Sequence, residues 1–111
     1  MKLHIDTSNR EKIVIGIDGE KFKTEAIKEK SQKLLPFINE VLKKKEIKIE
    51  DISEIEVNTG PGSYTGLRVG VSVANTIGWA LKIPVNGKNL EKGESGEIKY
   101  SEWDSNNLTY L

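Results

Sequence analysis

A length of 111 residues suffices for one domain with a modest core and excludes two lobes with a cleft between them. The 17 Lys and Arg residues balance the 17 Asp and Glu residues. A net charge of zero argues against electrostatic binding of nucleic acid or an anionic membrane over a large surface. The chain has no Cys and one His, His4, which excludes a thiol nucleophile, a disulfide framework and a multi-histidine metal site within one chain. Because no apolar run approaches the ~20 residues of a membrane span and no signal peptide opens the chain, we expect a cytoplasmic protein.

Three antiparallel strands joined by short turns are predicted for the beginning of the chain. Residues 1–7 alternate apolar and polar side chains, residues 12–17 are dense in β-branched side chains, and residues 20–27 alternate again. Asp18 and Gly19 separate the last two segments, and this pair tolerates the positive φ values of a type I′ turn.

A first helix is predicted for residues 31–45, and a short strand for residues 54–58. Apolar side chains recur in the helix at three- and four-residue spacing, at Leu34, Leu35, Ile38, Val41 and Leu42. Pro36 removes a backbone hydrogen bond past the first turn, so this helix either starts near Leu34 or bends at the proline.

A second helix is predicted for residues 65–81, followed by a closing strand at residues 83–85. This helix is apolar nearly all round, so it must be covered on most sides. A row of small residues recurs in it at four-residue intervals, at Gly66, Gly70, Ala74 and Gly78. Such a row forms a smooth face on which another backbone can approach closely.

The predicted order of elements is β-β-β-α-β-α-β, which indicates an α/β fold with a mixed five-stranded sheet and two main helices. We interpret residues 1–87 as the folded domain and residues 88–111 as a polar C-terminal tail. The tail carries three aromatic residues, Tyr100, Trp103 and Tyr110, so it could dock on the domain or on a partner.

A glycine-rich turn precedes the second helix and comprises Gly60, Pro61, Gly62, Ser63, Tyr64, Thr65 and Gly66. A turn that opens a helix favours anion binding, because the first helical N–H groups lack partners within the helix. The spacing fits neither common phosphate motif. Leu67 follows Gly66 where a P-loop needs Lys, and the third Gly of a dinucleotide fingerprint arrives one residue late. Phosphate binding and a helix cap by Ser63 or Thr65 therefore both stay open.

The other polar residues each allow a structural and a functional interpretation. Arg68 could meet a phosphate or a carboxylate of a partner, or form an internal salt bridge. Asp6 and Thr7, at the end of the first strand, could hold a phosphate or a metal-bound water, although such a cluster is more often a turn. His4 lies mid-strand and is expected to be structural. The sequence shows no nucleophile–base pair, so by itself it makes no positive case for an enzyme.

Three segments resemble the TsaB (YeaZ) family, which is the non-catalytic partner in bacterial biosynthesis of threonylcarbamoyladenosine (t6A) in tRNA. They are residues 1–8 (MKLHIDTS), residues 31–42 (SQKLLPFINEVL) and, most specifically, residues 60–70 (GPGSYTGLRVG), and the resemblance runs to about Gly87. It implies a single actin/Hsp70/sugar kinase-like domain of the ribonuclease H-like fold, in a form reduced or truncated to the family's N-terminal domain.

The resemblance implies no catalytic residue, no cofactor and no metal. Asp6 and Thr7 would then be a vestigial phosphate site. Lys30 stands where many members of the family carry a His, the place of a metal-binding His in the catalytic homologue TsaD.

The resemblance also implies partners. A TsaD-like subunit, which transfers the threonylcarbamoyl group to A37 of tRNA, would pack on the two helices, and the chain would form a weaker homodimer without it. A TsaE-like ATPase would complete the larger assembly, tRNA would be contacted only indirectly, and no membrane would be involved. The expected contacts in the two helices are Leu34, Leu35, Ile38, Leu42, Gly70, Val71, Ala74 and Ile77.

Two other functions compete with the partner role. One is a small nucleotide-binding or phosphotransfer domain that completes its cleft by homodimerising. The other is a peptidase, because the family has been labelled peptidase-like by homology, and the single His and the absence of Cys make it the weakest of the three.

Overall fold

The described part of the chain is a four-stranded sheet with two helices, which confirms the α/β class. The computed structural model describes residues 1–26 and 29–87, so the predicted tail at residues 88–111 lies outside the described residues. In chain order the elements are β1 (Lys2–Asp6), β2 (Lys12–Ile17), β3 (Glu20–Glu25), α1 (Lys30–Lys44), a short 3₁₀ helix η1 (Ile49–Asp51), β4 (Glu54–Val57) and α2 (Tyr64–Leu81).

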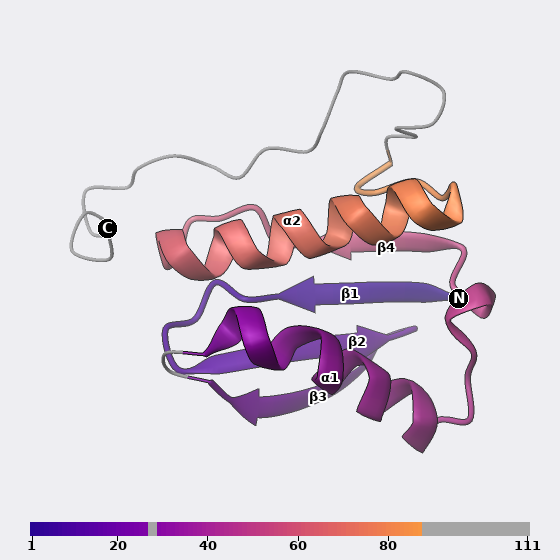
Figure 1. The fold of residues 1–111 in the computed structure, drawn as a ribbon, viewed down its shortest axis with the longest axis horizontal. Coiled ribbons are helices and arrows are strands. Elements are labelled where there is room, and N and C mark those ends of the chain that lie inside the picture. Colours follow the sequence, from indigo (N-terminus) through magenta and orange to yellow (C-terminus); the bar gives the residue numbers. More distant parts are fainter. Residues whose placement is uncertain (27–28, 88–111) are drawn as a thin grey trace.

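The sheet is mixed, as predicted, with the strand order β3-β2-β1-β4. The strand β1 pairs antiparallel with β2 and parallel with β4. Both helices cover the same face of the sheet, with α1 against β2 and α2 against β1 and β4 (Figure 1). Because side chains alternate across a strand, Leu3 and Ile5 of β1 are buried under the helices, whereas Lys2 and His4 lie on the opposite face. We call this opposite face the open face.

Within residues 1–26 and 29–87 the predicted fifth strand at residues 83–85 is reduced to a single residue, so the expected count of five strands is not confirmed. Val85 forms an isolated parallel bridge with Ile55 on the outer side of β4. Pro84 accepts a hydrogen bond from Ile55 N–H at 2.9 Å but has no N–H to donate. Asn86 then adopts a left-handed φ of 49°, which ends the extended backbone. A strand therefore starts in the expected place and direction but cannot continue.

The helix α1 lies within one residue of its predicted bounds and contains Pro36. It begins at Lys30, so the alternative start near Leu34 was wrong. Pro36 is exposed, which means that its missing hydrogen bond lies away from the buried stripe of Leu34, Ile38, Val41 and Leu42. The helix tolerates the proline because tertiary packing of that stripe outweighs one lost backbone bond.

The small-residue row of α2 is used inside the chain. A Cβ atom on Gly66 would lie 2.1 Å from the backbone oxygen of Thr7, and one on Gly70 would lie 2.3 Å from the Thr7 hydroxyl. A Cβ on Gly78 would lie 2.3 Å from a methyl of Val85. The close approach that the row permits is therefore that of the chain's own strand ends. Within residues 1–26 and 29–87, neither α2 nor another helix is long and apolar enough to span a bilayer.

Candidate functional site

Asp6, Ser8 and Asn58 form a polar cluster at the carboxyl ends of β1 and β4. The Oδ1 atom of Asp6 accepts hydrogen bonds from Ser8 N–H at 2.9 Å, from the Ser8 hydroxyl at 2.6 Å and from Nδ2 of Asn58 at 3.3 Å. Oδ1 of Asn58 accepts from Gly60 N–H at 2.9 Å. The cluster thus ties the end of β1 to the first residue of the glycine-rich turn.

The carboxyl group of Asp6 is held in its charged form. Burial raises the pKa of Asp6, but the hydrogen bonds from Ser8 and Asn58 together lower it by more, so the pKa lies below its ordinary value. The geometry matches the turn interpretation of this cluster, because the bonds run to residues two positions along the chain and across to β4. A role of Asp6 and Thr7 in holding phosphate stays a prediction.

Replacing Asp6 with Asn is expected to make the free energy of unfolding fall less steeply as the pH is lowered into the acid range. Because the pKa of Asp6 is lower in the folded chain than in the unfolded chain, its stabilisation is fully present above the unfolded value of about 3.9 and is lost as the pH falls through the folded pKa. Urea unfolding at several pH values checks this. The control is Glu11→Gln, a change at an exposed carboxyl. Equal losses in acid for the natural chain and Asp6→Asn would contradict the prediction.

Thr7 and Ser63 hold the start of α2 against the end of β1. The Thr7 hydroxyl is fully buried and donates to the carbonyl of Gly66 at 2.5 Å. Ser63 N–H donates to the carbonyl of Ser8 at 2.8 Å, and its Oγ accepts from Gly66 N–H at 3.3 Å. The helix-cap interpretation of the glycine-rich turn is therefore confirmed, with Ser63 as the capping residue.

The remaining predicted residues of the turn lie around this cap. Pro61 and Thr65 are exposed, and Gly60 and Tyr64 are half-buried. Arg68 is exposed on the next turn of α2, and its guanidinium carbon lies 5.8 Å from the centroid of the Tyr64 ring. This contact is a cation–π interaction, which none of the three interpretations of Arg68 anticipated.

Lys30, at the first position of α1, has its ammonium group inside the fold. Its Nζ atom donates to the carbonyl of Arg10 at 2.7 Å and to the carbonyl of Ala26 at 2.9 Å. Burial lowers the pKa of this lysine. The ammonium thus joins the loop before β2 to the end of β3. The described residues, 1–26 and 29–87, contain no group of three acidic or histidine side chains that could hold a metal ion.

Replacing Lys30 with Met is expected to lower the free energy of unfolding by about 1–3 kcal/mol, because two carbonyls lose their donor in a buried place. The matched control is Lys33→Met, one turn along the same helix, where the lysine is exposed and forms an i,i+4 ion pair with Glu29 at 3.4 Å. That change should cost less than about 0.5 kcal/mol. Chemical denaturation measures both. Similar losses for the two variants would show that the Lys30 contacts contribute little.

Six of the eight predicted interface residues are largely buried inside the chain itself, so they expose little surface to a partner, and their contact with one stays a prediction. They are Leu34, Ile38, Leu42, Gly70, Val71 and Ala74. The physical reason is that the apolar stripes of α1 and α2 face the sheet and each other. Leu35, which is 54% exposed, and the half-buried Ile77 are the two that reach the surface.

A groove runs along the seam between α1 and α2, away from the sheet. One hollow of about 540 Å³ is lined by Leu35, Pro36, Ile38, Asn39, Leu42, Ile49 and Ile77. A second, of about 400 Å³, is lined by Ser31, Thr65, Arg68, Val69, Ser72 and Val73. Val69, Val73 and Ile77 follow one another at four-residue spacing, a signal that the sequence contained but that the prediction did not use. Trp79, which is 66% exposed, adds a large apolar side chain on the outer side of α2.

Comparison with known proteins places the chain near two groups of related proteins. The model of a family described as "TsaD: tRNA N6-adenosine threonylcarbamoyltransferase" matches residues 23–89. The tRNA threonylcarbamoyladenosine biosynthesis protein TsaB of Bacillus subtilis is 38% identical and aligns with 76% of this chain. The tRNA N6-adenosine threonylcarbamoyltransferase of Nitrosospira multiformis is 39% identical over 50% of this chain and 16% of its own length.

The solved structure of YeaZ from Pseudomonas aeruginosa has a similar fold. It superposes with a TM-score of 0.64 and 25% sequence identity, covering 76% of this chain and 41% of that one. The alignment with the Bacillus TsaB covers 38% of the TsaB chain. The chain thus spans about two fifths of the length of these two relatives.

Proposed function

This chain belongs to the TsaD family and is TsaB-like within it, and on that premise we propose that it is a non-catalytic partner subunit of the machinery that makes t6A37 in tRNA. Its direct partner would be a TsaD-like catalytic subunit. The functional residues and activities of the full-length relatives are assigned to this chain only as part of this proposal.

The observation that carries the proposal is the apolar seam between α1 and α2. Leu35 and Ile77 line the hollow in this seam, on the side of the two helices that the sheet does not cover. The family match at residues 23–89 contains both helices, so a TsaD-like subunit would carry an equivalent pair. Two such pairs can pack face to face about an approximate twofold axis, which would bury both seams.

The net charge of the chain bears on which subunit would contact tRNA. Because the chain has a net charge of zero, it offers little general attraction for the phosphates of tRNA. The tRNA contacts would therefore be made by the TsaD-like subunit.

Two further associations belong to the proposal. A TsaE-like ATPase would complete the assembly. When the TsaD-like subunit is absent, the same seam would pair two copies of this chain in a weaker homodimer.

Reconstitution of the modification reaction tests the proposal. The TsaD-like subunit from the same source, a TsaE-like ATPase, threonylcarbamoyl adenylate and substrate tRNA are combined with and without this chain, and t6A is measured by mass spectrometry of the digested tRNA. We expect t6A to form only when the chain is added, and not when the chain replaces the TsaD-like subunit. Equal product with and without the chain would overturn the proposal.

Calorimetry separates the proposal from its nucleotide-binding rival. Titration of the isolated chain with ATP and Mg²⁺ should produce no heat of binding, because Oδ1 of Asp6 and the Thr7 hydroxyl already have partners within the chain. Micromolar binding would favour a nucleotide-binding or phosphotransfer domain that completes its cleft by homodimerising.

A further inference from the structure

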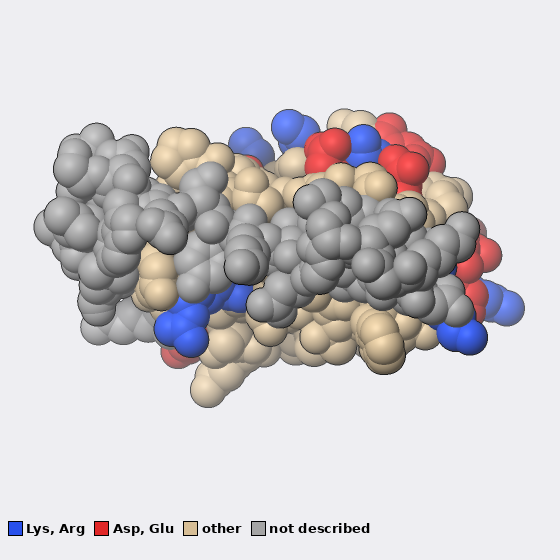
Figure 2. All heavy atoms as spheres, turned by 90° about the horizontal axis from the view of Figure 1, so that it is seen from above, with Lys and Arg blue, Asp and Glu red and all other residues tan. Residues whose placement is uncertain are grey.

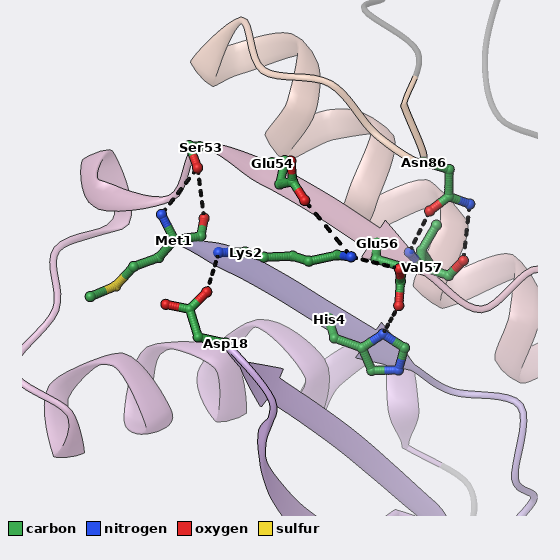
Figure 3. Close-up of polar contacts among 9 residues, drawn as sticks. All are labelled: Met1, Lys2, His4, Asp18, Ser53, Glu54, Glu56, Val57 and Asn86. Atoms are coloured by element: carbon green, nitrogen blue, oxygen red, sulfur yellow. Dashed lines mark hydrogen bonds and ion pairs between the residues drawn. The ribbon is translucent and has the colours of Figure 1, made fainter.

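The sheet has two edge strands, β3 and β4, and the outer side of β4 is closed by the chain itself. Ile55 N–H donates to the carbonyl of Pro84 at 2.9 Å, and Asn86 N–H donates to the carbonyl of Ile55 at 2.8 Å. The side-chain amide of Asn86 accepts from Val57 N–H at 2.8 Å and donates to the Val57 carbonyl at 3.0 Å (Figure 3). The backbone groups of β4 that point away from β1 are thus already paired.

The β3 edge, which is the outer side of that strand, differs from the edge at β4. Ala26 N–H donates to the carbonyl of Glu11, just before β2, at 2.8 Å, which fixes the direction of the backbone groups along β3. Because that direction alternates in an antiparallel ladder, the N–H and C=O groups of Lys21, Lys23 and Glu25 point away from β2. Within the part of the chain that the structure describes, these groups have no backbone partner. The β3 edge therefore offers donors and acceptors to another extended chain.

Two lysines line the β3 edge on the open face of the sheet. Lys21 and Lys23 lie on this face together with their cross-strand neighbours on β2. Both are exposed, and among the described residues neither side chain has an ion-pair partner. By contrast, Nζ of Lys2 lies 2.8 Å from Oε2 of Glu56 on β4. Figure 2, which views the molecule from the side of α2 and β4, shows basic and acidic side chains next to one another along its upper edge. The β3 edge thus carries positive charge that no described acidic group pairs with.

The helix side of the β3 edge is partly apolar. Phe22, between the two lysines, is half-buried and packs against the core. Nζ of Lys44, in the last turn of α1, lies 5.6 Å from the centroid of the Phe22 ring. A strand added to β3 would place its side chains alternately on the open face and beside Phe22. A complementary strand would therefore have acidic side chains toward Lys21 and Lys23 and an apolar side chain toward Phe22.

We propose that the β3 edge binds an extended segment of a partner protein in which acidic side chains alternate with apolar ones. The segment adds a strand to the sheet, with its backbone paired to Lys21 and Lys23. Main-chain hydrogen bonds then supply affinity, and the two ammonium groups supply selectivity for acidic residues. Glu25 would repel an acidic side chain, so it limits the segment to the part of β3 before it. This edge lies away from α2 (Figure 1), so the site is separate from the seam and does not rest on the proposed partner role.

Fluorescence anisotropy of a dye-labelled peptide tests this inference on the full chain. The peptide alternates Glu and Val, and the same peptide with Lys in place of Glu is its control. We expect saturable binding of the Glu peptide and none of the Lys peptide. Lys21→Glu combined with Lys23→Glu should weaken binding about 10-fold or more, and high salt should also weaken it, because both reduce the charge attraction. The matched control is Lys33→Glu with Lys43→Glu, which changes the charge equally on exposed positions of α1.

A proline at position 23 separates strand addition from attraction between charges. Lys23→Pro removes the outward N–H that an added strand needs and leaves the bonds between β3 and β2 in place. Lys23→Ala removes the same side chain but keeps the N–H, so it is the matched control. We expect Lys23→Pro to bind the Glu peptide about 10-fold more weakly than Lys23→Ala.

Amide exchange measured by NMR on the natural chain gives a second readout that needs no variant. Binding of the Glu peptide should slow exchange at Lys21 and Lys23. Exchange at Phe22 should stay unchanged, because its N–H points toward β2 and is already bonded there. If Lys23→Pro lowers the stability of the chain, this measurement decides alone.

Four results would overturn the inference. The first is no binding of the Glu peptide. The second is binding with unchanged exchange at Lys21 and Lys23, which would assign it to charge alone. The third is binding that survives the Lys21 and Lys23 changes but is lost on Leu35→Glu with Ile77→Glu, which would place the peptide in the seam between α1 and α2. The fourth is a dimer of the chain that Lys23→Pro abolishes, which would make a second copy the occupant. None of these measurements includes the TsaD-like subunit, so their failure and that of the proposed function are distinguishable.

Discussion

Replacing Gly66 with Ala is expected to lower the free energy of unfolding by about 2 kcal/mol or more. The added Cβ would lie 2.1 Å from the backbone oxygen of Thr7, and neither backbone can yield without moving β1 or α2. Such overpacking costs about 3 kcal/mol, whereas the better helix propensity of Ala contributes about 1 kcal/mol in the opposite direction. The clash is therefore the larger effect and decides the sign.

Urea unfolding of Gly66→Ala measures this loss, with Ser72→Ala as the control on the exposed side of the same helix. The control should change the stability by less than about 0.5 kcal/mol. A stability of Gly66→Ala equal to or above that of the natural chain would show that helix propensity outweighs the contact. It would also contradict the close approach of Thr7 to α2.

Replacing Leu35 and Ile77 together with Glu is expected to weaken binding of the TsaD-like subunit about 100-fold, or about 2.7 kcal/mol. Both side chains line the hollow between α1 and α2, and an interface there would bury two carboxylates without partners. Because Leu35 is 54% exposed and Ile77 half-buried, the free energy of unfolding of the chain alone should fall by less than about 1 kcal/mol. Surface plasmon resonance gives the affinity, and denaturation gives the stability.

The control for this pair is Val14→Glu, the same kind of apolar-to-acidic change at a half-buried position of β2 on the open face. It should leave the affinity for the TsaD-like subunit unchanged. If the Leu35 and Ile77 pair still binds with natural affinity, the interface lies elsewhere on the chain. If Val14→Glu weakens binding as strongly, the partner contacts the open face.

The sequence predicted the secondary structure well because its signals are local. Alternation in residues 1–7 and the Asp18–Gly19 turn predicted β1 and the hairpin of β2 and β3, which the structure confirms. The fifth strand is not confirmed beyond one residue, because the sequence pattern does not take account of the missing N–H of Pro84 or the left-handed φ of Asn86. Because of Pro36, the sequence did not decide where α1 begins. Local patterns do not show whether tertiary packing compensates for one lost backbone hydrogen bond.

The site was less predictable than the fold. The sequence marked Asp6, Thr7 and Ser63 as polar residues of interest, but their partners are up to 59 residues away along the chain, as Thr7 and Gly66 show. The apolar residues of the two helices were recognised as a group, yet the pattern alone did not separate those facing the sheet from those facing outward. On α2, which is apolar nearly all round, periodicity offers no contrast to resolve this.

By itself, the sequence determined the strand–helix order, the glycine-rich turn and the resemblance to TsaB, because each depends on residues close together in the chain. Only the tertiary structure decided that Gly66, Gly70 and Gly78 accommodate the chain's own Thr7 and Val85 rather than a partner. It also decided that Leu35 and Ile77 are the predicted contacts at the surface, and that one face of the sheet is charged and lacks a described helix. These facts depend on which distant segments meet, and that is fixed by packing both helices on one face of a four-stranded sheet.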